Sequence, residues 1–145
     1  MPGAALVAVD VGTGSARAGV FGPDGRMLGR AERPIALHRP MPDHAEQSSD
    51  DIWSAVAQSV REARTSAGVA EEEVAGVSFD ATCSLVALDH EDRPASVSTT
   101  GEDRWNVVVW LVHRAIAEAE ACTATSIGCW TRSAAQCRPK WRSRS

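Results

Sequence analysis

The chain has 145 residues, of which 43% are hydrophobic and 23% are charged, and its formal net charge is −4. This is the composition of an ordinary globular domain, and the length allows one domain with a core but is small for a two-domain enzyme. The apolar run 4–9 is too short for a signal peptide or a membrane span. We therefore expect a cytoplasmic protein that does not insert into a membrane.

The charge is unevenly distributed along the chain. Residues 127–145 carry five basic residues and no acid, which leaves 10 basic against 19 acidic residues in 1–126. An acidic body argues against nucleic acid as a partner. The four cysteines form no C-x-x-C pair, which argues against a zinc site and indicates reduced thiols.

Two apolar runs in Ala5–Phe21 flank a turn of small and hydroxyl-bearing residues, a pattern that predicts a β-hairpin. Gly12 and Gly14 let the backbone approach a ligand, Thr13 and Ser15 add hydroxyl donors, and Arg17 adds a positive charge. Asp10 ends the first strand, where a carboxylate can hold Mg²⁺. The turn thus suits phosphate binding, although Gly-Thr-Gly-Ser also occurs in ordinary turns.

A third antiparallel strand is predicted over 26–35, after the turn Gly22–Gly25. The loop 36–48 contains His38 and His44, which we interpret as surface residues because no third metal ligand lies nearby. A helix is expected from a cap at Ser48 or Ser49 to about Ser66, ending at Gly68. Its predicted buried stripe comprises Ile52, Trp53, Val56, Ala57, Val60 and Ala63.

The second half of the chain predicts a buried strand over 74–79, followed by the polar cluster Asp80–Ser84 and a strand over 85–88. Because ligand groups gather at strand ends, this cluster is a second candidate site wall, or else a capped turn. A β-branched strand is predicted over 106–111, and residues 113–121 have the composition of a helix start.

Three motifs in this order resemble the N-terminal part of the FGGY family of carbohydrate kinases. They are Asp10-Val-Gly-Thr-Gly-Ser-Ala-Arg17, His44-Ala-Glu-Gln-Ser-Ser-Asp-Asp-Ile-Trp53 and Gly76-Val-Ser-Phe-Asp-Ala-Thr-Cys-Ser-Leu85. The third motif, together with Trp110–Ala115, is most similar to pentulose kinases of the D-ribulokinase type. The resemblance spans residues 5–125 and is more specific than any one motif.

The resemblance implies an α/β fold of the ribonuclease H-like, actin-like ATPase class, incomplete here and opening with an antiparallel hairpin and meander. It implies transfer of the ATP γ-phosphoryl group to a sugar hydroxyl, with ATP and Mg²⁺ as cofactors. Asp10 would help to hold Mg²⁺, and Gly12, Thr13, Gly14, Ser15 and Arg17 would bind the nucleotide phosphates. The sugar would contact Asp80, Ala81, Thr82 and Cys83.

Two departures from the family pattern limit this reading. Val112 stands where near relatives carry an aspartate, and an apolar side chain cannot accept a hydrogen bond from a sugar hydroxyl. The family's catalytic aspartate and adenine-binding domain also lie beyond the end of this chain. We therefore expect residues 1–125 to form a partial N-terminal domain that contains no catalytic residue of its own.

The likeness to the family stops after Thr123-Ala124-Thr125. Permitted codons for residues 126–145, read one base out of frame, encode a segment with the family's Val-Gly-Gly and Ser-Pro-Glu-Met landmarks. We therefore expect residues 126–145 to be a non-native tail that follows a single-base deletion near Ser126. The basic and tryptophan residues of this tail would then have no designed role.

Our leading hypothesis is a fragment of an ATP-dependent pentulose kinase, with D-ribulose as the expected sugar, that is inactive alone. The main alternative is a non-catalytic actin-like module that binds sugar or phosphate or assembles with another chain. A further alternative is a nucleotide-dependent chaperone-like or actin-like protein that shares only the hairpin, although the Asp80–Ser84 cluster argues against it. The pattern does not indicate an oligomeric state.

Overall fold

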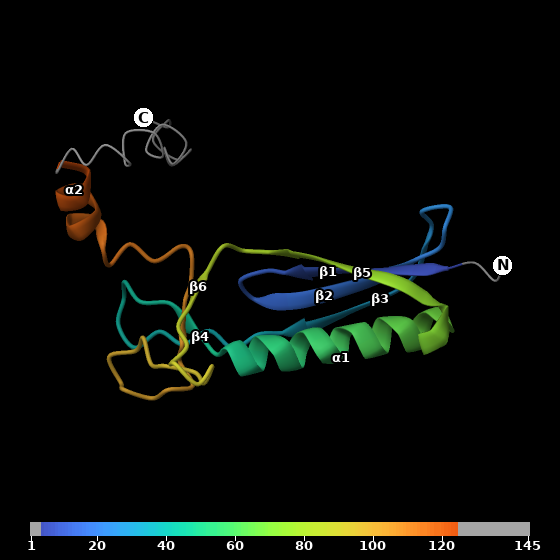
Figure 1. Ribbon diagram of the computed structural model, residues 1–145, viewed down its shortest axis with the longest axis horizontal. Helices are drawn as coiled ribbons and strands as arrows, with labels where there is room; N and C mark the ends of the chain where they lie inside the picture. Colours follow the sequence, from blue (N-terminus) through green and yellow to red (C-terminus); the bar gives the residue numbers. More distant parts are fainter. Residues whose placement is uncertain (1–3, 125–145) are drawn as a thin grey trace. The chain divides into compact units, whose positions relative to one another are not determined.

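The computed structural model describes residues 4–124, and its first three strands form an antiparallel meander (Figure 1). These strands are β1 (Ala5–Val11), β2 (Ser15–Phe21) and β3 (Met27–Pro34). Buried and exposed residues alternate along β1, as expected for a strand with one covered face. The predicted hairpin and third strand are therefore confirmed.

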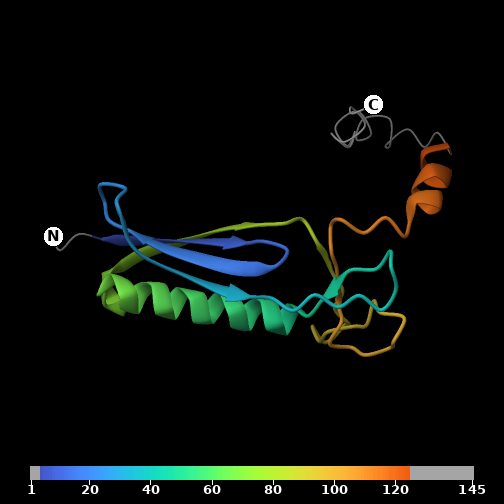
Figure 2. The same ribbon diagram turned by 180° about the vertical axis from the view of Figure 1, so that it is seen from behind.

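The helix α1 (Ser49–Ala67) covers one face of this meander (Figures 1 and 2). The Ser48 side chain accepts a hydrogen bond from the Asp51 N–H at its start, and Gly68 ends it with a φ of 65°. Both ends agree with the prediction because they follow ordinary capping chemistry. Ala55, Val56, Ser59 and Ala63 form its buried stripe.

The interface between α1 and β3 depends on the missing side chain of Gly29. A Cβ atom built on Gly29 would lie 2.5 Å from the Ala63 carbonyl oxygen and 2.7 Å from the Ala67 amide nitrogen. Both neighbours are helix backbone, which cannot rotate away as a side chain can. The helix therefore lies close to the strand at this point.

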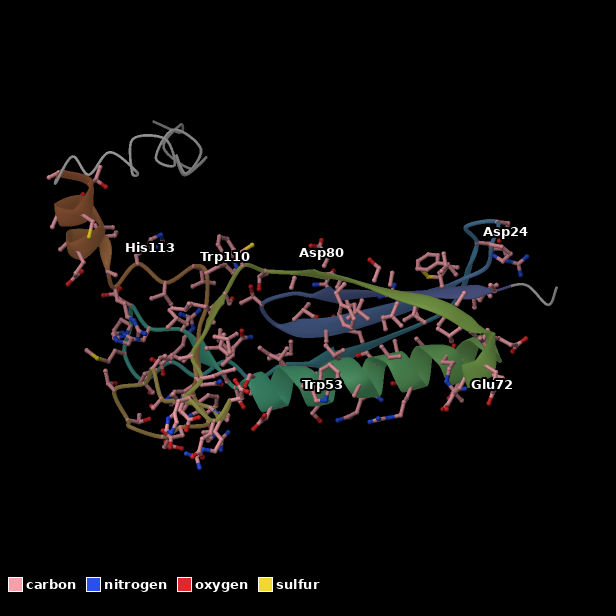
Figure 3. The ribbon with its side chains drawn as sticks, in the orientation of Figure 1. Asp24, Trp53, Glu72, Asp80, Trp110 and His113 are labelled. Atoms are coloured by element: carbon pink, nitrogen blue, oxygen red, sulfur yellow. The ribbon has the colours of Figure 1, made fainter. Side chains whose placement is uncertain are left out.

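Trp53 was predicted to be buried, and this prediction is wrong. Its side chain is 67% exposed on α1 (Figure 3). Relative to the stripe through Val56, Ser59 and Ala63, Trp53 lies at the border of the buried face. A spacing pattern identifies the stripe but does not show how wide the covering sheet is.

The strand β5 (Val74–Ala81) follows α1 through the 3-10 turn η1 (Glu71–Glu73) and pairs in parallel with β1. The sheet order is β3-β2-β1-β5, so β5 is the edge strand of the part of the chain that the structure describes. Val77 is 51% exposed and Phe79 is 58% exposed. The prediction of a buried strand was therefore right about the strand and wrong about its burial.

A second, smaller sheet has the order β4-β7-β6, with all pairs antiparallel. Its strands are β4 (Glu46–Gln47), β6 (Leu85–Val86) and β7 (Val107–Val108), so the strands predicted over 85–88 and 106–111 are each only two residues long. Asn106 fixes this sheet to the helix: its Oδ1 accepts from the Ser49 N–H (3.0 Å), and its Nδ2 donates to Ser49 Oγ (3.0 Å) and to the Ala87 carbonyl (3.1 Å).

His38 and His44 are half-buried rather than surface residues. The His38 ring stacks on Trp105 with 4.4 Å between ring centroids, which explains its partial burial. Within residues 4–124, no group of three or more His, Cys, Asp or Glu residues is placed to hold a metal ion.

Residues 113–124 belong to a unit separate from residues 4–112 and contain the helix α2 (Ile116–Ala124). This confirms the predicted helix start in that region. None of the helices within residues 4–124 has the length and hydropathy of a membrane span. The tail predicted over 126–145 lies outside the described residues.

Candidate functional site

The turn between β1 and β2 is closed by a hydrogen bond from the Gly12 N–H to the Ser15 carbonyl (2.9 Å). On its other side, the Gly14 carbonyl accepts from the Ile35 N–H (2.9 Å). No atom lies within 4 Å of a Cβ built on Gly14, so the space beside it is open. The turn is thus a fixed and accessible backbone surface.

Asp10 and Arg17 lie opposite each other on β1 and β2 and form an ion pair, with 3.2 Å between Oδ2 and Nη1. A Cβ on Gly12 would lie 2.6 Å from Arg17 Nη2, so glycine leaves the space that the guanidinium occupies. Glu32 lies 4.0 Å from Arg17 Nε and accepts from Ser15 Oγ at 2.7 Å. Arg17 is therefore held beside the turn as a fixed positive charge.

The parallel pairing of β1 and β5 brings Asp80 beside Asp10. Asp80 lies on the side of the sheet opposite α1 (Figure 3). Its Oδ1 accepts from the Ala81 N–H at 3.0 Å. Two exposed carboxylates thus lie where parallel strands end, and such oxygen donors are the ligand type that Mg²⁺ prefers.

The segment after β5 adjoins the hairpin. The Thr82 N–H donates to the Val11 carbonyl (3.1 Å), and the hydroxyls of Thr82 and Ser84 lie 3.4 Å apart. Ala81 and Cys83 are exposed on either side of Thr82. The two clusters predicted from the sequence, Asp10–Arg17 and Asp80–Ser84, are therefore adjacent in the structure.

Two further residues contact the tip of the hairpin and were not predicted as part of the site. Trp110 Nε1 donates to Thr13 Oγ1 at 3.1 Å, and Gln47 Nε2 donates to the Thr13 carbonyl at 2.7 Å. Gln47 is only 2% exposed. Both residues fall within motifs used for the family resemblance, but no local pattern indicates a contact across 97 or 34 residues of chain.

The face of the sheet opposite α1 contains a hollow of about 350 Å³. Asp10, Arg17 and Asp80 line it together with apolar residues that include Phe21 and Met27. Phe21 lies across Gly19, where an added Cβ would come within 2.8 Å of its ring. The charged groups of the site thus border an apolar surface.

Residues 5–135 match the model of the N-terminal domain of the FGGY family of carbohydrate kinases. The chain belongs to this family. It is 49% identical over 118 residues to an FGGY carbohydrate kinase domain-containing protein of Danio rerio, covering 81% of this chain and 21% of that protein. It is 42% identical over 126 residues to a D-ribulokinase of Saccharomyces cerevisiae, covering 85% of this chain and 18% of that protein.

Solved structures of FGGY sugar kinases share this fold. A xylulose kinase from Rhodospirillum rubrum superimposes with a TM-score of 0.69 at 21% identity, covering 87% of this chain and 24% of that chain. A kinase described as a xyloylose kinase, from Brucella ovis, gives a TM-score of 0.71 at 20% identity, covering 83% and 24% of the two chains. The predicted actin-like α/β fold is therefore confirmed, as a partial domain. The chain spans about a fifth of the length of the curated relatives it matches.

Proposed function

We propose that this chain is the N-terminal part of an ATP-dependent kinase that phosphorylates a pentulose, with D-ribulose as the preferred sugar. The observation that carries the proposal is the contact between the Asp10–Arg17 hairpin and the Asp80–Ser84 segment. It puts a phosphate-compatible turn beside a polar segment suited to a hydroxyl-rich substrate. The 42% identity to the yeast D-ribulokinase favours D-ribulose over other sugars.

The donor set of the hairpin suits a magnesium–nucleotide complex. Thr13 and Gly14 present backbone N–H groups without bulky side chains. Gly12 contributes space rather than a donor, because its N–H donates to the Ser15 carbonyl, and the Ser15 hydroxyl would have to release Glu32 before it could donate to a phosphate. Asp10 would hold Mg²⁺, and Arg17 would neutralise charge on the transferred phosphoryl group. When bound, Mg²⁺ supplies charge neutralisation at the phosphate oxygens. Since Arg17 pairs with Asp10 here, loading the site would exchange this ion pair for contacts to metal and phosphate.

The sugar would lie against Asp80, Ala81, Thr82 and Cys83. Asp80 and Thr82 can pair with sugar hydroxyls, while the small side chain of Ala81 leaves room for the ring or chain of the sugar. Val112 offers no hydrogen-bond acceptor at the position where related pentulose kinases carry an aspartate. We expect this change to weaken sugar binding.

The chain alone is proposed to be inactive. Kinases that close two domains over sugar and nucleotide assemble the site and exclude water only on closure.

We also propose that residues 126–145 arise from a one-base deletion. Sequencing the gene across the codons for residues 124–128 tests this, and an unshifted frame in independent clones would refute it.

A cytoplasmic location without nucleic-acid or membrane partners fits this proposal. The body of the chain is acidic, with 19 acidic and 10 basic residues in 1–126, which disfavours binding to the phosphate backbone of nucleic acids.

The alternative function is a non-catalytic sugar- or phosphate-binding module. This alternative needs only the hairpin and the Asp80–Ser84 segment, which the described residues contain and bring together.

A coupled assay of ADP production with a panel of pentuloses tests the proposal on this chain and on a frame-restored version. We expect no turnover from the chain, and turnover with D-ribulose from the restored protein that falls at least 100-fold in Asp10→Asn. Turnover by the short chain would refute its proposed inactivity. A restored protein that binds D-ribulose in calorimetry but never releases ADP would favour the binding module.

A further inference from the structure

We infer that Trp110 is a positioning residue that orients the hydroxyl of Thr13 as a hydrogen-bond donor toward the phosphate site. This inference deepens the proposed function and rests on it. It starts from the contact between Trp110 Nε1 and Thr13 Oγ1, which are 3.1 Å apart although 97 residues separate them.

The chemistry of the two groups sets the direction of this bond. An indole N–H can only donate, so Thr13 Oγ1 must accept. The hydroxyl carries one hydrogen and two lone pairs, so accepting from Trp110 leaves that hydrogen for a second partner. With the indole on one side of the oxygen, the hydrogen is directed away from Trp110. An anionic oxygen bound over the turn is an acceptor of the kind that this donor would serve.

The small sheet explains why Trp110 can hold this position although its own side chain is 61% exposed. The residue before it, Val109, is 1% exposed, and its N–H donates to the Ala45 carbonyl at 3.0 Å. The Trp110 N–H donates to Ser84 Oγ at 3.3 Å. The backbone that carries the indole is therefore fixed by buried neighbours.

The same small sheet also fixes the backbone of Thr13, through Gln47 on β4. Gln47 is almost completely buried, and its Nε2 donates to the Thr13 carbonyl at 2.7 Å. The carbonyl of Thr13 is thus contacted by Gln47 on β4, and its hydroxyl by Trp110, two residues after the end of β7. β4 and β7 are neighbours in one sheet. This arrangement preorganises the turn, which is how a short loop keeps a donor in place before ligand arrives.

The first measurement is spectroscopic and needs no ligand. In a ¹⁵N-labelled chain, Trp110→Phe identifies the Trp110 indole N–H signal by its loss. Thr13→Val removes the acceptor at nearly constant shape, and we expect it to shift that signal and to speed its exchange with solvent roughly fivefold or more. Thr13→Ser should restore it, and Trp53→Phe should leave it unchanged. If Thr13→Val changes neither the chemical shift nor the solvent exchange rate of the Trp110 indole N–H, the inference is overturned.

The second measurement is a double-mutant cycle on the binding of inorganic tripolyphosphate with Mg²⁺. Trp110→Phe should weaken binding roughly fivefold to tenfold in the wild-type background and have almost no effect in Thr13→Val, because it acts through that hydroxyl. Equal losses in both backgrounds would overturn the inference. If the wild-type chain shows the indole response but binds no tripolyphosphate, the proposed phosphate site fails, and with it the ligand role of Thr13, while the Trp110 contact itself stands.

Discussion

Asp89 shows how a single carboxylate stabilises a turn outside the site. Its Oδ1 accepts from the N–H groups of Arg93 (3.0 Å) and Glu91 (2.8 Å), and its Oδ2 lies 2.9 Å from Arg93 Nε. The Arg93 N–H, and then that of Glu91, lower the pKa of the Asp89 carboxyl below its usual value, because these donors favour the charged form. A lowered pKa in the folded state contributes stability that is present above the unfolded pKa and is lost as pH falls through the folded pKa.

Asp89→Asn tests this assignment. We expect the variant to unfold at lower urea concentration than the wild type at about pH 7. The difference should shrink as the pH falls below the ordinary aspartate pKa and through the lowered pKa of Asp89, where the wild-type carboxyl also takes up a proton. Urea midpoints over a series of acidic pH values measure it. A difference that stays constant with pH would show that the charge of Asp89 does not stabilise the turn.

Gln47 is the residue whose loss should loosen the hairpin tip. Gln47→Met keeps the volume but removes the donor to the Thr13 carbonyl, and we expect the free energy of unfolding to fall by about 1–3 kcal/mol. Gln58→Met is the matched control, since Gln58 is exposed and donates only to Ser54 within α1. It should change stability by less than about 0.5 kcal/mol. Equal effects of the two variants in urea unfolding would contradict this role of Gln47.

At the level of elements, the packing of α1 on β3 makes a sharper prediction. Gly29→Ala places a methyl group against the backbone of Ala63 and Ala67, and we expect a loss of about 2–3 kcal/mol as helix and strand move apart. Gly14→Ala is the matched control because nothing lies near its Cβ, and it should cost less than about 1 kcal/mol. Thermal unfolding followed by circular dichroism measures both, and similar losses would refute the close approach at Gly29.

Elements with local signals were predicted well from the sequence. The ends of α1 follow from Ser48 and Gly68, and the meander follows from alternation and turn residues. Long-range features were not predicted: the exposure of Trp53 depends on how far the sheet extends, and the contacts of Trp110 and Gln47 with Thr13 depend on the small sheet. The strands of the small sheet are only two residues long, which is too short for an alternating pattern of apolar and polar residues to predict how they pair.

For the whole molecule, the free edge at β5 is the dominant physical feature of the described residues. Parallel strands are normally covered on both faces and flanked by neighbours, yet Val77 and Phe79 are more than half exposed on this edge strand. An unpaired edge with apolar side chains is a template for pairing with another chain. The chain matches only about a fifth of the length of its relatives, so their remaining residues have ample length to cover such an edge.

We therefore expect the chain on its own to self-associate as its concentration rises. Phe79→Lys places a charge on the edge strand and should shift the chain towards monomer in sedimentation velocity, because extending the sheet across this edge would bury the ammonium group. Trp53→Lys is the matched control: Trp53 is also exposed, at 67%, but lies on α1 away from the edge. A chain that stays monomeric at every protein concentration tested would show that the exposed edge of β5 does not promote self-association. If Trp53→Lys prevents association as well as Phe79→Lys does, the contact lies on the helix rather than at β5.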